Sequence, residues 1–101
     1  MNVDKADKML KEAIDEALSI LGYKAKEIVY YFLEKEYGLK REEIPSNLKG
    51  FHDGLHMLFG IGANVIEKHI YNCTQNKIGV RIRIEPEQDF VEILNRLKSF
   101  A

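Results

Sequence analysis

Apolar residues recur every three or four positions over most of this chain, and that spacing restricts it to helical architectures. In residues 4–21 the recurring positions are Ala6, Met9, Leu10, Ala13, Ile14, Ala17, Leu18 and Leu21. Positions three and four apart share one face of an α-helix, so this segment predicts an amphipathic helix. Similar spacing predicts further helices over 25–37, 48–59 and 63–75, and a last one after residue 85. We therefore expect an all-α bundle of about five helices.

Proline and glycine mark the connections between these helices. Pro45 disfavours helical geometry at Ile44, the one strongly apolar residue among polar neighbours, so we expect Ile44 to return to the core. The glycines of Gly60-Ile61-Gly62 predict a tight reversal. The last helix has two candidate starts. Pro86 suits its first position, and Asp89 with Glu92 offers a capping box instead.

One segment does not follow the helical period. Residues 80–84 read Val-Arg-Ile-Arg-Ile, an alternation that predicts one short, half-buried β-strand near the C-terminus. A single strand leaves its backbone hydrogen bonds unpaired. Pairing with the same strand of a second copy would form a homodimer, with Val80, Ile82 and Ile84 at the interface. The segment could also lie extended across its own helices, or accept a strand from another protein.

Size and charge exclude several classes of protein. The chain has 101 residues, the length of one domain over 1–101, and such a domain buries roughly 65% of its unfolded surface. Its 15 basic and 16 acidic residues give a net charge of -1, which provides no general attraction to nucleic acid or anionic lipid. The longest apolar run, residues 28–33, is too short to cross a membrane. With Cys73 as the only cysteine, we expect no disulfide and a cytoplasmic location.

Two histidines are the candidates for metal chemistry. His52 and His56 lie four residues apart in His-Asp-Gly-Leu-His, so both imidazoles share one helix face, as in zinc-binding His-Glu-x-x-His motifs. The sequence does not place a third ligand: Glu67 and His69 belong to the next helix. We therefore expect structural histidines, no metal, no cofactor and no catalytic residue.

Two further groups of residues are candidates for partner binding. The second helix is rich in aromatic residues, of which Tyr30 and Tyr37 are the expected contacts for a protein partner. Arg81 and Arg83 extend this predicted surface. Together with Lys77 they form the only dense basic cluster, which supports an alternative interpretation as a DNA-associated transcriptional regulator. A sequence pI of about 6.3 makes nucleic acid the less favoured partner.

The central part of the chain resembles a known family. The pattern consists of Leu33-Glu34, Tyr37-Gly38-Leu39, Glu43-Ile44-Pro45, Phe51, Leu55, Phe59-Gly60, Gly62-Ala63, Ile66-Glu67 and Ile70. It is similar to the Nitrosopumilus output domain and to small archaeal helical proteins, over roughly residues 10–80. The resemblance implies a helical output or interaction module in archaeal signalling, and it assigns no catalytic residue.

These observations lead to one functional expectation. We expect a non-enzymatic regulatory or protein-interaction domain, a signalling output module that forms a homodimer and has no membrane association. The DNA-associated regulator that uses Lys77, Arg81 and Arg83 is the alternative.

Overall fold

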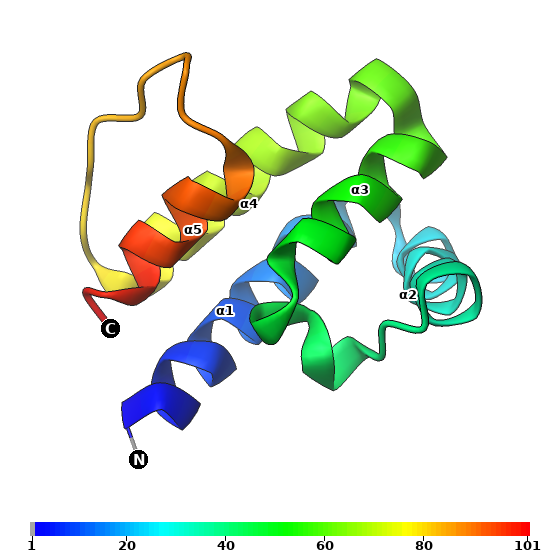
Figure 1. Ribbon diagram of the computed structural model, residues 1–101, viewed down its shortest axis with the longest axis horizontal. Coiled ribbons are helices and arrows are strands. Elements are labelled where there is room, and N and C mark those ends of the chain that lie inside the picture. The colour runs from blue at the N-terminus through cyan, green and yellow to red at the C-terminus, as the bar shows by residue number, and fades with distance from the viewer. Residues whose placement is uncertain (1) are drawn as a thin grey trace.

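The computed structural model describes residues 2–101, with side chains from residue 5 onward. Its elements are α1 (Asn2–Leu18), η1 (Ser19–Leu21), α2 (Tyr23–Tyr37), η2 (Arg41–Ser46), α3 (Leu48–Phe59), η3 (Gly60–Gly62), α4 (Ala63–Ile78) and α5 (Phe90–Lys98), where η denotes a short 3-10 helix. The expected all-α architecture of about five helices is confirmed (Figure 1). No helix within residues 2–101 combines the length and the apolar character that a membrane span requires.

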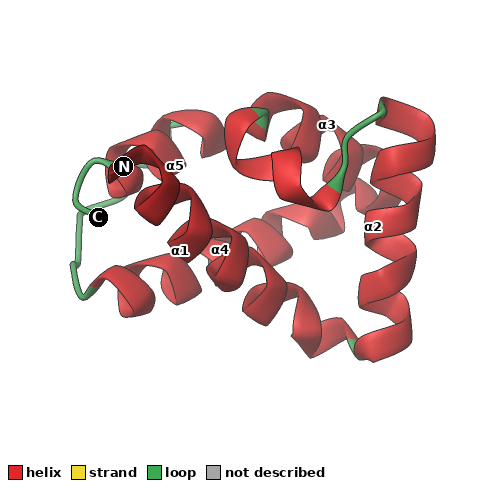
Figure 2. Ribbon diagram, turned by 90° about the horizontal axis from the view of Figure 1, so that it is seen from below, coloured by secondary structure: helices red, strands yellow, loops and turns green. Residues whose placement is uncertain are grey.

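The helices pack around α1 and α4, which make the most extensive contact in the fold. α5 packs on α3 and α4, and α2 packs on α3. α2 stands at the end of the molecule that is remote from both chain termini (Figures 1 and 2). Within residues 2–101, one long face of α2 is left without a helix packed against it (Figures 1 and 2).

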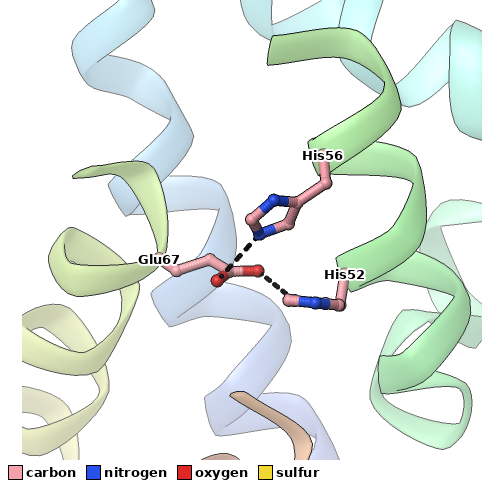
Figure 3. A group of neighbouring side chains, drawn as sticks. All are labelled: His52, His56 and Glu67. Carbon is pink, nitrogen blue, oxygen red and sulfur yellow. Dashed lines mark hydrogen bonds and ion pairs between the residues drawn. The ribbon is translucent and has the colours of Figure 1, made fainter. Parts of the chain in front are cut away.

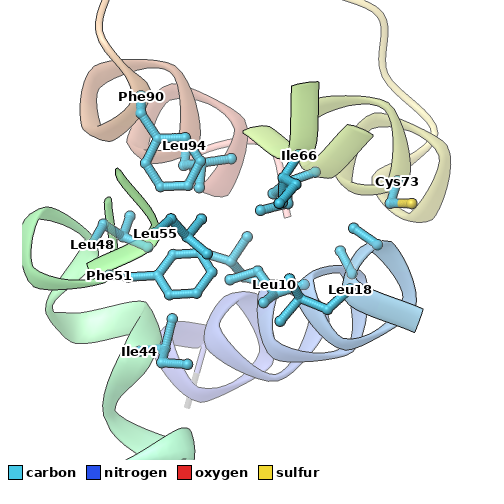
Figure 4. Close-up of a cluster of buried hydrophobic side chains, with 14 of the residues drawn as sticks. Leu10, Leu18, Ile44, Leu48, Phe51, Leu55, Ile66, Cys73, Phe90 and Leu94 are labelled. Atoms are coloured by element: carbon cyan, nitrogen blue, oxygen red, sulfur yellow. The ribbon is translucent and has the colours of Figure 1, made fainter. Parts of the chain in front are cut away.

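The core consists largely of the apolar residues whose three- and four-residue spacing predicted the helices (Figure 4). The largest fully buried side chains are Phe51, Phe90, Leu10, Ile14, Leu18, Leu33, Ile44, Leu55, Ile70, Ile93, Leu94 and Leu97. The prediction for Ile44 is confirmed, since it is 2% exposed and joins η2 to the core. Cys73 is buried and unpaired, as expected.

α2 and α3 approach each other closely at Gly54. A Cβ atom at this position would lie 2.3 Å from Cδ2 of Leu33, which is itself buried. It would also lie 3.6 Å from the ring of Tyr37. Gly54 is therefore the residue that lets α3 pack against α2, and no larger side chain fits without displacing Leu33.

The predicted β-strand is wrong, because residues 80–85 have no regular secondary structure. The alternation instead reflects burial: Ile82 and Ile84 pack against the core of their own chain, while Arg81 and Arg83 are exposed. Gln75, which is 5% exposed, holds the segment. Its main-chain oxygen accepts from the amide of Val80 at 3.1 Å, and its side-chain oxygen accepts from the amide of Ile82 at 2.9 Å. Residues 80–85 therefore lie extended across the helices of their own chain, and we call them the strap. This arrangement gives no support to pairing of residues 80–84 with the same segment of a second copy.

The start of the last helix agrees with the second of the two candidates. α5 begins at Phe90, and the carboxylate of Asp89 accepts a hydrogen bond from the amide of Glu92 at 2.7 Å. Pro86 lies in a turn four residues earlier, so its assignment to the first helical position is wrong. A side-chain cap satisfies an otherwise free amide, which explains why it sets the boundary.

Replacing Gly54 with alanine tests the contact between α2 and α3. We expect G54A to lower the free energy of unfolding by about 1 kcal/mol or more, because overpacking outweighs the gain in helix propensity. Gly62 is the matched control, since a Cβ there meets only Phe59 at 3.9 Å. G62A should change stability by less than about 1 kcal/mol. Equal effects of the two variants in chemical denaturation would contradict the close approach.

Replacing Gln75 with alanine tests the strap. Q75A leaves the amide of Ile82 without its acceptor, so we expect a loss of about 1–2 kcal/mol and faster hydrogen exchange at Ile82. Amide hydrogen exchange in the middle of α1 should speed up only as far as the lower global stability of Q75A requires. Unchanged protection at Ile82 would show that another group holds the segment.

Candidate functional site

α3 and α4 bring three ligand-type side chains together. His52 and His56 lie one helical turn apart on α3, with ring centroids 4.3 Å apart. Both side chains are about one-third exposed, at 33% and 32%. His52 also stacks on Phe90 of α5, with centroids 5.6 Å apart and an interplanar angle of 26°. The packing of α5 thus restrains one of the two imidazoles.

Glu67 of α4 completes the group (Figure 3). One carboxylate oxygen lies 2.5 Å from Nδ1 of His52, and the other lies 3.3 Å from Nε2 of His56. The carboxylate points between the two rings (Figure 3). We call His52, His56 and Glu67 the His-His-Glu cluster. Glu67 is therefore the third candidate ligand, which the sequence alone did not place.

The turn between α3 and α4 produces this arrangement. α3 ends at Gly60, which has φ 56° and ψ -134°, a backbone conformation that strongly favours glycine. The chain then passes through η3 into α4. Because α4 buries Ile66 and Ile70, it carries the neighbouring Glu67 into the contact with α3.

The cluster has the composition and proximity of a metal site. Its candidate ligand atoms, one from each residue, all lie within 4.8 Å of one another. A buried carboxylate is costly unless a positive charge or hydrogen bonds compensate it, and Glu67 is 5% exposed. Among residues 5–101, the side chains that bind its carboxylate are those of His52 and His56. The polar contacts that compensate the burial of Glu67 therefore come from the two histidines of α3.

A second polar group surrounds Asp15 on α1. Its carboxylate accepts from the hydroxyl of Tyr30 at 2.9 Å, from Lys26 at 3.1 Å and from Arg41 at 2.5 Å. The guanidinium carbon of Arg41 lies 4.1 Å from the ring centroid of Tyr30. Asp15, Tyr30 and Arg41 border a surface hollow of about 500 Å³ between α1, α2, η2 and the end of α4.

The contacts of Asp15 and Tyr30 shift the pKa values of both groups. Burial alone would raise the pKa of Asp15, but hydrogen bonds from Lys26 and Tyr30 and the charges of Lys26 and Arg41 lower that pKa below its ordinary value. Burial, followed by the hydrogen bond to Asp15, raises the pKa of Tyr30. Tyr30 therefore stays a neutral donor, and Asp15 stays ionised at neutral pH.

The two tyrosines predicted to contact a partner differ in exposure. Tyr30 is 8% exposed and its hydroxyl donates to Asp15, so little of its side chain is accessible to a partner. Tyr37 is 36% exposed, and its ring centroid lies 6.0 Å from that of Phe32. Tyr23, at 73%, and Tyr31, at 66%, are more exposed.

These exposed tyrosines belong to an apolar surface. Ile28, at 61% exposure, lies between them on α2, and Ile20, at 57%, precedes them in η1. At 100° per residue Tyr23, Ile28 and Tyr31 fall within one side of α2, opposite the buried Val29 and Leu33. We call these three residues, together with Ile20 of η1, the outer face of α2.

The basic residues proposed for DNA binding have partners in their own chain. Lys77 lies 3.2 Å from Glu16 and 3.8 Å from Glu12. Arg83 pairs with Glu85 at 2.8 Å, and Arg81 donates to Asn76. Acidic partners reduce the positive potential that a DNA-binding surface needs, so the structure adds nothing in favour of this alternative.

Comparisons with family models, with curated proteins and with solved structures find no match for this chain.

Replacing Tyr30 with phenylalanine tests the Asp15 network. Y30F removes one hydrogen bond that lowers the pKa of Asp15, so that pKa should rise toward 3.8, as measured by NMR titration of the carboxyl group. Asp15 stabilises the fold above the unfolded-state pKa, and this contribution is lost as the pH falls through its folded-state pKa. We expect Y30F to lose about 1 kcal/mol at neutral pH and to show a weaker decline on acidification. The matched control Y31F should change neither property.

Proposed function

We propose that this protein is a non-enzymatic regulatory domain that acts through protein–protein interaction, as a homodimer paired through the outer face of α2. The observation that carries the proposal is the exposure of three large side chains, Tyr23, Ile28 and Tyr31, on the side of α2 opposite its buried residues. Clustered apolar side chains at a surface are characteristic of interaction sites. Tyrosine is also enriched in such interfaces.

The charges on α2 favour a second copy of the same chain as the partner. Glu27, Tyr31 and Lys35 are spaced four residues apart and form one stripe along the helix. In an antiparallel contact centred on Tyr31, Glu27 of each copy faces Lys35 of the other. A two-fold axis repeats this opposite-charge pair, which is the self-complementarity that an isologous interface requires.

The resemblance to archaeal output domains supports the same functional class. A domain of that kind transmits a signal by binding and needs no catalytic group. The proposed dimer uses the outer face of α2 in place of Val80, Ile82 and Ile84, because Ile82 and Ile84 already pack on their own core.

Solution mass tests the proposal. Sedimentation equilibrium across the micromolar range should give twice the chain mass of 11.7 kDa. Y31E should give the mass of a single chain, because two buried carboxylates would face each other at the axis. The control M57E changes a side chain that is 71% exposed on α3 and should remain dimeric.

A charge exchange tests the orientation of the two helices. K35E should weaken the dimer, because Glu27 then faces a like charge, and adding E27K should restore it. A single-chain mass for the native protein would overturn the homodimer. Equal disruption by M57E and Y31E would overturn the assignment to α2.

A further inference from the structure

We propose that the His-His-Glu cluster is a binding site for a divalent transition-metal ion, and that Zn²⁺ fits its donor set best. The site lies between α3 and α4, and the argument for it does not depend on the outer face of α2. It joins two helices that follow one another through the glycine-containing turn at residues 60–62 and that pack against each other.

The geometry requires little rearrangement. Zinc bonds of 2.0–2.2 Å to nitrogen and oxygen in a tetrahedral site place neighbouring donor atoms about 3.3 Å apart. Nε2 of His56 already lies 3.3 Å from one oxygen of Glu67. Nδ1 of His52 lies 2.5 Å from the other oxygen, and the three donors fall within 4.8 Å of one another. Small side-chain rotations at His52 and Glu67 would bring all three around one ion.

The charge of the cluster favours a cation. Glu67 presents a carboxylate that is almost fully buried, and within residues 5–101 no lysine or arginine forms an ion pair with it. A neutral imidazole donates one hydrogen bond but no charge, whereas a divalent ion neutralises the carboxylate and uses the lone pairs of both rings. Metal binding therefore satisfies all three side chains at once.

The donor types determine which ions fit. Two imidazole nitrogens and one carboxylate oxygen suit zinc, cobalt and nickel, whereas magnesium and calcium prefer oxygen donors. Three protein ligands leave a fourth position for water. His52 borders a surface hollow of about 410 Å³, and both histidine side chains are about one-third exposed, so solvent reaches the histidine side of the cluster.

The position of the site gives the ion a structural role. An ion held by α3 and α4 would fix the angle between them beyond the turn at Gly60. A ligand that binds only the folded state raises stability in proportion to the logarithm of its concentration. Zinc should therefore raise the melting temperature of this protein as its concentration increases.

Calorimetric titration of metal-free protein without an affinity tag, with Zn²⁺ as the probe, tests the site. We expect about one equivalent of zinc per chain and a melting temperature that rises with zinc concentration. Magnesium should neither bind nor compete. Cobalt should bind at the same stoichiometry and give the visible absorption of a low-coordinate nitrogen–oxygen site, which reports on the ligands directly.

Three variants separate this site from adventitious binding. His56 is partly exposed, so H56Q should fold and lose the zinc response and the cobalt spectrum. E67Q should do the same, with circular dichroism confirming that it folds. His69 is the remaining histidine and lies outside the cluster, so the control H69Q should bind zinc as the native chain does.

Two results would overturn the proposal. One is native protein that binds no zinc, which would show that the imidazoles serve only to pair with Glu67. The other is zinc binding that H56Q and E67Q leave unchanged or that H69Q abolishes. Because Tyr31 is not part of the cluster, Y31E should retain zinc binding, which keeps this test separate from that of the dimer.

Discussion

A buried carboxylate between two helices is the constraint around which this fold is arranged. Glu67 lies on the face of α4 that also buries Ile66 and Ile70, so α4 cannot rotate to hydrate the carboxylate without exposing apolar side chains. The compensation must come from α3, which supplies His52 and His56. Gly60 permits this because its positive φ turns the chain back toward α3 at the required point. One glycine conformation thus determines the environment of one charged group.

α3 connects the two surfaces that are candidates for function. Through His52 and His56 it contacts α4, and through Gly54 it packs against Leu33 of α2. Leu48, Phe51 and Leu55 of the same helix belong to the core. The chain therefore combines a polar cluster between α3 and α4 with an apolar, uncovered side of α2. Neither feature is needed to complete the hydrophobic core.

The helices and most of the core were predictable because burial alone produces a 3.6-residue period. The strand prediction at residues 80–84 failed because the same alternation arises when an extended segment packs on helices, and its hydrogen-bond acceptor is the side chain of Gln75. The burial of Tyr30 was missed because its partner, Asp15, lies on another helix. The His-His-Glu cluster was half predicted: a four-residue spacing identifies the histidines, but only the turn at Gly60 brings Glu67 to them. A carboxylate between two buried isoleucine positions was the available signal.

The most direct test of this account is anomalous diffraction at the zinc edge, from crystals grown with an equivalent of zinc. The account predicts one peak within bonding distance of Nδ1 of His52, Nε2 of His56 and a carboxylate oxygen of Glu67. A map with no peak there, and with the histidine rings turned away from Glu67, would contradict it.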